Sequence, residues 1–217
     1  PSSHKFSFER ANKLKAFIDT LVTLYVLDLV PIEFYLTEDF DEMQKARGLE
    51  CYMGMGNLKN TPGGRTDGTN KIIYSGGGDE YYAHEIVHIY LSPLFPNCHY
   101  YFGEGIATYY GGSICYPLEW HIKRMAQYLD KHLEIDLNDL FSFWYMDKLT
   151  NPAYVFGGLF CQMALEKGGL KKLKKLMNYG TKPEDFYTAI GKEFGVKKEK
   201  LNEFLRKEIK KRAEKIK

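Results

Sequence analysis

The sequence predicts an α+β protein, with a small mixed set of strands in its N-terminal part and helices in its C-terminal half. Residues 32–36 alternate as a strand does, and residues 71–75 form a second short apolar run. After residue 104, apolar residues recur mostly at helical spacing. With 217 residues, of which 44% are hydrophobic and 27% charged, the chain has the composition of a globular protein and ample material for a core.

The N-terminal part predicts one helix followed by alternating strands and connections. Residues 7–29 carry apolar side chains at helical spacing, and Pro31 ends this segment. The further predicted elements are, in chain order, a strand at 32–36, a helix at 37–47 closed by Gly48, a strand at 49–55, a glycine-rich turn at 61–68 and a strand at 71–75.

The C-terminal half predicts a succession of helices. The Asn151-Pro152 pair is a typical helix start, and Gly168-Gly169 is a typical helix end. The predicted helices cover residues 118–132, 136–143, 154–167, 170–179, 183–194 and 196–217.

Residues 79–91 contain the strongest chemical motif of the chain, His84-Glu85-Ile86-Val87-His88. On a helix, His84 and His88 lie one turn apart on the same face, so both imidazoles can reach a single ion. Glu85 lies to one side of them, where it can polarise water without joining the ligands. Such polar groups on a buried helix need a partner, for which a divalent cation is suited; the alternative is a surface helix that carries two histidines by chance.

A hydrolytic zinc site takes three protein ligands and leaves one position for water, so a third ligand is expected nearby. Residues 101–110 contain the run Gly103-Glu104-Gly105-Ile106-Ala107. Together with the His84–His88 motif, this run resembles the gluzincins, the superfamily of thermolysin and the alanyl-aminopeptidase type enzymes. Their third ligand is a glutamate in such a run. The resemblance therefore implies that His84, His88 and Glu104 bind one zinc ion per chain.

The resemblance also implies a zincin-like catalytic domain. Its N-terminal half, residues 1–112, would contain the small mixed sheet, the metal helix and the third-ligand helix. Its helical half would be residues 113–217, with a cleft between the two halves. In gluzincin domains the strand before the metal helix often borders the cleft, so residues 71–75 would offer backbone hydrogen bonds to an extended peptide.

Tyr154 continues the resemblance. In the aminopeptidase branch, a tyrosine three residues before a glycine hydrogen-bonds the oxyanion of the tetrahedral intermediate, and Tyr154 and Gly157 repeat that spacing. The alternative is a core tyrosine, which carries weight in a chain with 17 tyrosines.

Two positions depart from the family pattern. Gly54-Met55-Gly56-Asn57 lies where the aminopeptidases have a Gly-x-Met-Glu-Asn sequence, and a glycine replaces the glutamate that holds the substrate's amine. This difference argues against a conventional aminopeptidase. Thermolysin-like members also place an acidic residue four positions after the glutamate ligand, to orient a zinc-bound histidine; Thr108 stands there instead.

We therefore expect a zinc-dependent peptidase that cleaves a peptide or protein substrate through a metal-activated water. His84, His88 and Glu104 are the expected zinc ligands, Glu85 the general base and Tyr154 the oxyanion donor. The alternative is a catalytically inactive scaffold of the same fold that binds zinc or peptide. Zinc binding alone requires neither Glu85 nor Tyr154, so their presence favours the enzyme.

The remaining features set the expected context. Residues 197–217 contain ten Lys or Arg against four Glu, yet few aromatic residues interleave with them, which favours a solvated helix face over nucleic-acid binding. No apolar run is long enough to span a membrane. The chain starts with Pro1, which suggests processing or truncation, and we expect an extracytoplasmic monomer.

Two further expectations concern residues near the Glu104 segment. Cys98 and Cys115 flank it, so they either form a disulfide that braces the segment or remain as buried thiols. His99 is expected in an exposed loop.

Overall fold

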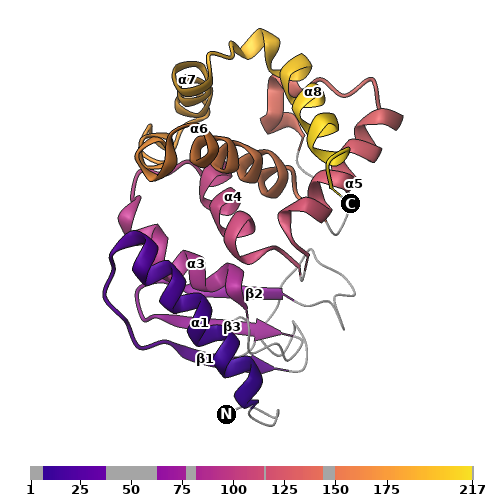
Figure 1. Ribbon diagram of the computed structural model, residues 1–217. Coiled ribbons are helices and arrows are strands. Elements are labelled where there is room, and N and C mark those ends of the chain that lie inside the picture. Colours follow the sequence, from indigo (N-terminus) through magenta and orange to yellow (C-terminus); the bar gives the residue numbers. More distant parts are fainter. Residues whose placement is uncertain (1–6, 38–62, 77–81, 115, 144–149, 217) are drawn as a thin grey trace, which may run out of the picture. The chain divides into compact units, whose positions relative to one another are not determined.

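The computed structural model describes residues 7–37, 63–76, 82–114, 116–143 and 150–216 (Figure 1). The chain forms two compact units, residues 1–94 and 95–217. The predicted helix at 37–47 and strand at 49–55 lie outside the described residues, apart from Thr37. The predicted division at residue 112, with a cleft between the halves, remains a prediction.

The first unit contains a mixed three-stranded sheet with the strand order β1-β3-β2. Strands β1, Glu33–Thr37, and β3, Ile72–Gly76, are parallel to each other and confirm the two strands that the sequence predicts. Strand β2, Gly63–Asp67, is antiparallel to β3. The described part of the chain is therefore α+β, as the sequence predicts.

The predicted turn at 61–68 is wrong, because most of it forms strand β2. The chain reverses only after Asp67, whose carboxylate accepts hydrogen bonds from the backbone N–H groups of Thr69 and Asn70, both at 3.0 Å. The glycines serve a different purpose. A methyl group at Gly64 would overlap the ring of Tyr82, so glycine lets this ring lie directly on the strand.

The prediction that residues 71–75 pair with substrate is also wrong. Strand β3 is the central strand, and its backbone pairs with β1 on one side and with β2 on the other. Its hydrogen-bonding groups are therefore already used within the sheet. Among the described strands, β1 and β2 are the outer ones.

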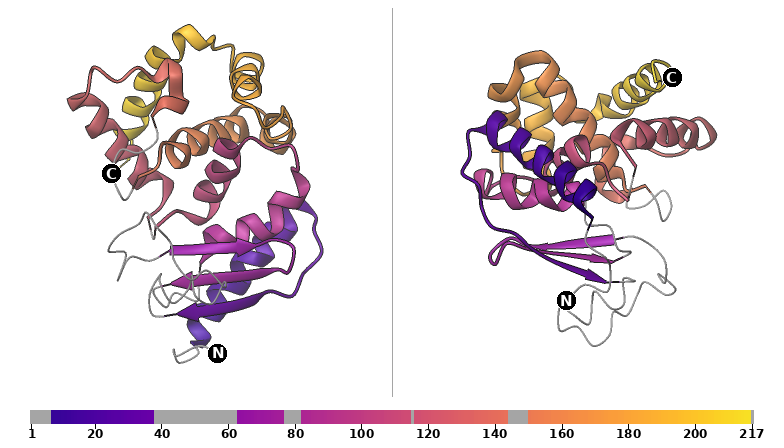
Figure 2. Two further views of the ribbon diagram at one scale, coloured as in Figure 1. Left: turned by 180° about the vertical axis from the view of Figure 1, so that it is seen from behind. Right: turned by 60° about the horizontal axis from the view of Figure 1, so that its bottom comes forward.

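Helices α1, Phe8–Tyr25, and α3, Ala83–Leu91, lie on the same face of the sheet (Figure 2). Helix α1 ends earlier than predicted, because Val26 adopts a left-handed conformation with φ of 56°. Helix α3 is followed by a short 3₁₀ helix, η1, Ser92–Leu94. The buried side chains of this unit include Leu21, Ile73, Ile86, Val87 and Leu91.

The second unit is helical in its described part. Its elements are α4 (Tyr100–Gly111), α5 (Leu118–Lys131), η2 (Leu137–Ser142), η3 (Ala153–Gly157), α6 (Gly158–Leu176), α7 (Pro183–Phe194), η4 (Lys198–Lys200) and α8 (Leu201–Ala213). They confirm the predicted helices with shifted bounds. The predicted break at Gly168-Gly169 is a kink inside α6, where both residues leave helical dihedral angles.

Helix α8 carries much of the basic C-terminal stretch, and part of this charge has structural partners. Arg206 donates hydrogen bonds to the carbonyl oxygens of Leu129, His132 and Ile135, at 2.8, 3.0 and 2.7 Å. Leu129 lies in the last turn of α5, and the other two residues follow the end of this helix. Arg212 forms a two-pronged ion pair with Glu166. No helix among the described residues combines the length and the apolar character needed to cross a membrane.

Helix α4 packs closely on η3 and α6. A methyl group at Gly105 would overlap the backbone of Gly157, and one at Gly157 would overlap the carbonyl oxygen of Tyr101. Two backbones can approach this closely only where both lack side chains. Gly105 and Gly157 thus allow close packing of α4 on η3.

Gly105→Ala should lower the free energy of unfolding by about 1–3 kcal/mol or more, because the added methyl group has no space beside Gly157. Gly103→Ala is the matched control in the same helix. The nearest atom to its added methyl group is the Cys98 sulfur at 3.9 Å, so the better helix propensity of alanine should leave stability unchanged or raised. Denaturant unfolding of both variants checks this prediction, and equal losses would contradict it.

Candidate metal centre

The motif His84–His88 lies on the largely buried helix α3. Tyr82 occupies the N-cap position, and the helix begins at Ala83, directly before the first histidine. His84 and Glu85 are buried and His88 is half-buried, so the polar side of this helix does not face open solvent. Burial of such groups is costly unless they have partners.

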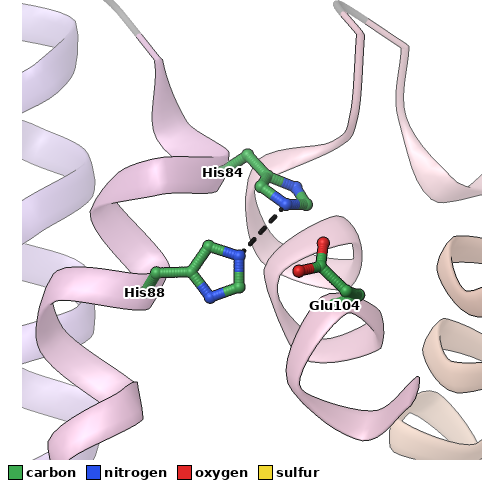
Figure 3. Close-up of side chains that lie close together, drawn as sticks. All are labelled: His84, His88 and Glu104. Carbon is green, nitrogen blue, oxygen red and sulfur yellow. Dashed lines mark hydrogen bonds between the residues drawn. The ribbon is translucent and has the colours of Figure 1, made fainter. Parts of the chain in front are cut away.

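The two imidazoles lie close together. The Nε2 atoms of His84 and His88 are 3.3 Å apart, and their ring centroids are 4.9 Å apart with an interplanar angle of 73°. Glu104 completes the group: one ligand atom from each of the three residues lies within 4.8 Å of the others (Figure 3). The side chains point toward a common centre, so this group could hold a metal ion.

The donor set suits zinc. Zinc–nitrogen bonds of ~2.0–2.1 Å in a tetrahedral arrangement place neighbouring ligand atoms ~3.3 Å apart, which matches the distance between the two imidazole nitrogens. Two imidazoles and one carboxylate are also the ligand set of hydrolytic zinc sites. The identity of the metal belongs to the proposal below.

Glu85 is hydrogen-bonded by a residue that the sequence patterns did not single out. The Thr66 hydroxyl lies 2.5 Å from Glu85 Oε2 and 3.2 Å from the Glu85 backbone carbonyl oxygen. Thr66 belongs to β2, the segment predicted as a turn, and it is this strand that brings the hydroxyl beside α3. The sequence contains no signal for it, because Gly63–Asp67 has no alternation of apolar and polar residues.

Helix α4 positions Glu104 through contacts along its length. His99 is its N-cap, and the Nδ1 atom accepts a hydrogen bond from the Tyr101 N–H at 3.2 Å. Thr108 is fully buried and donates its hydroxyl hydrogen to the Glu104 carbonyl oxygen at 2.8 Å.

The expectation that His99 lies in an exposed loop is wrong. Its side chain is only 6% exposed and packs among the rings of Phe102, Phe141 and Phe186. Burial lowers the pKa of His99 from 6.5 to about 4, against a weaker opposing effect of Asp185. The imidazole is therefore neutral at pH 7, as an acceptor at Nδ1 requires.

Tyr154 lies on η3, which is a π-helix, and its side chain is half-buried. Single π-helical turns occur frequently at functional sites. Because η3 packs against α4 through Gly157 and Gly105, the elements that carry Tyr154 and Glu104 are in direct backbone contact. The catalytic role of Tyr154 remains a prediction.

Cys98 is a free, half-buried thiol. Of the two alternatives, a disulfide or an unbridged thiol, the structure therefore has the unbridged thiol at Cys98. Its sulfur lies 3.3 Å from the His99 carbonyl oxygen and 3.8 Å from the Met177 sulfur. Burial raises the pKa of this thiol to about 12. Cys115 lies outside the described residues.

No protein-family model, no curated protein and no solved structure significantly matches this chain.

Wild-type protein should bind about one zinc ion per chain, and His84→Ala, His88→Ala and Glu104→Ala should each lose it, because each substitution removes one of three ligands. Elemental analysis after dialysis measures the content. His132→Ala is the control, since this histidine pairs with Glu134 at the surface. Full zinc content in the Glu104→Ala protein would exclude Glu104 as a ligand.

His99 should make the protein sensitive to acid. Its pKa is about 4 when folded and near 6.5 when unfolded, so its contribution to stability is complete above pH 6.5 and is lost as the pH falls toward 4. The loss should amount to roughly 2–3 kcal/mol. His99→Asn keeps a capping acceptor but does not titrate. Melting curves of both proteins between pH 7 and 4.5 should show a steeper loss for wild type, and parallel losses would refute the assignment.

Proposed function

We propose that this chain is a zinc-dependent peptidase of the gluzincin type. The observation that carries the proposal is the convergence of His84, His88 and Glu104 on one point, with Glu85 beside them but held by Thr66. A zinc ion held by these ligands would lower the pKa of water toward ~7 and polarise a carbonyl group. The following roles belong to the side chains of this chain.

Glu85 is the general base. Its neighbour Thr66 donates a hydrogen bond to Oε2, which fixes the plane of the carboxylate. In this proposal Oε1 accepts a proton from the attacking water, and the carboxyl group later delivers that proton to the leaving amine.

Tyr154 is the oxyanion donor. Its phenolic hydroxyl would hydrogen-bond the oxygen that gains negative charge as the peptide carbonyl is attacked. The support for this role is the position of Tyr154 on a π-helix in backbone contact with the helix of Glu104.

Strand β2 is the better candidate to bind the peptide backbone. It is an outer strand among those described, and it lies beside α3 through Thr66 and through the Gly64–Tyr82 contact. An extended substrate could therefore add to the sheet there, with backbone hydrogen bonds supplying affinity independently of sequence. The predicted monomeric state and extracytoplasmic location remain predictions.

Glu85→Gln should lower the rate of hydrolysis by a factor of about 10²–10⁴, because the amide cannot accept the proton. The fold and the zinc content should stay at wild-type values, because the amide occupies the same space as the carboxylate. The assay is cleavage of a peptide library and of casein by zinc-loaded protein. Glu199→Gln, at an exposed position of η4, is the control and should cleave normally. Absence of cleavage by the wild-type protein would favour the non-catalytic scaffold.

Tyr154→Phe should lower kcat by ~10²–10³ with little change in KM, because the hydroxyl acts mainly in the transition state. The phenylalanine ring preserves packing, so the melting temperature should change little. A tyrosine that only supports the core would give the opposite pattern: a loss of about 1 kcal/mol in stability and an unchanged kcat. Kinetics and a thermal melt of the same sample distinguish the two.

A further inference from the structure

The buried face of α5 contains a polar group that the proposed reaction does not use. His121 is fully buried among the apolar residues Leu118, Ile122 and Met125 of this helix. Thr150, which precedes η3, is 1% exposed. Polar side chains in such positions are retained when they make specific hydrogen bonds.

These bonds form a chain with a defined direction. Arg124 Nε lies 3.2 Å from Thr150 Oγ1, and because a guanidinium can only donate, the threonine oxygen accepts. The threonine hydroxyl then donates to His121 Nδ1 at 3.4 Å. His121 Nε2 donates in turn to the Ser113 carbonyl oxygen at 3.1 Å, since a carbonyl only accepts. Every group has a matching role when His121 is neutral with its proton on Nε2.

Two members of this hydrogen-bonded group, Thr150 and His121, lie close to Tyr154 in the sequence or in space. Thr150 is followed by Asn151, whose backbone carbonyl oxygen accepts the Tyr154 N–H at 3.0 Å and whose side chain accepts the Ala153 N–H at 2.8 Å. The His121 ring also meets the Tyr154 ring directly, with centroids 6.1 Å apart and an interplanar angle of 64°. The Tyr154 backbone is thus held by Asn151, the residue directly after Thr150, and the Tyr154 ring contacts His121.

We propose that Thr150 and His121 are positioning residues that hold the Tyr154 phenol in the orientation required for oxyanion binding. The inference rests on the proposed function of Tyr154. A π-helical turn is closed by i→i+5 backbone hydrogen bonds in place of the i→i+4 bonds of an α-helix, and the ring contact from His121 on α5 adds a side-chain constraint to this turn. Catalytic groups tolerate displacements of only about 0.5 Å, so a loosened phenol costs rate even when the fold is intact.

Fluorine NMR of protein labelled with 3-fluorotyrosine tests the positioning without any activity measurement. The Tyr154 resonance is identified by its absence in Tyr154→Phe. Thr150→Val removes the hydroxyl but keeps the branched shape, and should shift or broaden this resonance. Thr150→Ser restores the hydroxyl and should restore the resonance. An unchanged Tyr154 resonance in the Thr150→Val protein would overturn the proposal.

Kinetics provide the second measurement. Thr150→Val should lower kcat by about 10- to 100-fold with KM and zinc content unchanged. In the Tyr154→Phe background it should cause no further loss, because Thr150 acts only through the phenol. If the double variant instead loses as much kcat as the product of the two single losses, the proposal is contradicted. Tyr187→Phe removes a part-buried hydrogen bond to the Leu140 N–H in the same unit and controls for a general loss of stability.

The two measurements separate the inference from the function on which it rests. If wild-type protein cleaves nothing, the proposed peptidase activity fails, while the fluorine spectrum still decides whether the Thr150 hydroxyl, which is hydrogen-bonded to His121, positions Tyr154. If the protein is an active peptidase and the spectrum of Thr150→Val is unchanged, only the positioning role fails.

Discussion

Two imidazole nitrogens 3.3 Å apart on a largely buried helix require a proton or a cation between them. His84 is buried, His88 is half-buried, and the Glu104 carboxylate lies within ligand distance of both. A divalent cation could be bound by the two imidazole nitrogens and the Glu104 carboxylate together. The other polar residue of this helix, Glu85, has its own partner in Thr66 and need not share the ion. In the proposed site, three side chains therefore bind the ion, and Glu85, which is hydrogen-bonded to Thr66, acts on the substrate water.

A second constraint acts at the backbone. Gly105 and Gly157 allow α4 and η3 to touch without intervening side chains, so the helix that carries Glu104 and the turn that carries Tyr154 pack directly against each other. The cap of α4 is equally specific, because the buried, neutral His99 accepts the Tyr101 N–H. Packing therefore determines the placement of one proposed ligand and one proposed catalytic group. A loop would not hold either residue as precisely as these helices do.

Sequence patterns predicted the features that depend on local periodicity. The helical spacing of His84 and His88, the glutamate between two glycines and most helices of the second unit follow from short stretches of chain. The patterns failed where long-range contacts decide. The glycines of β2 have the composition of a turn, but Gly64 serves the contact with Tyr82, and only the pairing with β3 shows that a strand is present. The central position of β3 is equally invisible without strand order.

Burial was a further limit. His99 and His121 have no motif around them, and their roles depend on residues up to 87 positions away, such as Phe186 beside His99. The proposed role of Thr150 depends on its hydrogen bonds with Arg124 and His121 of α5. Thr66 likewise depends on a strand that the sequence analysis took for a turn. Side chains of this kind become recognisable only when the fold places their partners beside them.

X-ray absorption at the zinc edge of zinc-loaded wild-type protein tests the central claim most directly. The account predicts four or five nitrogen or oxygen ligands at ~2.0–2.2 Å, with the scattering pattern of two imidazoles and no sulfur. A sulfur ligand at ~2.3 Å, or a spectrum without two imidazoles, would contradict the assignment of His84, His88 and Glu104 as the metal centre.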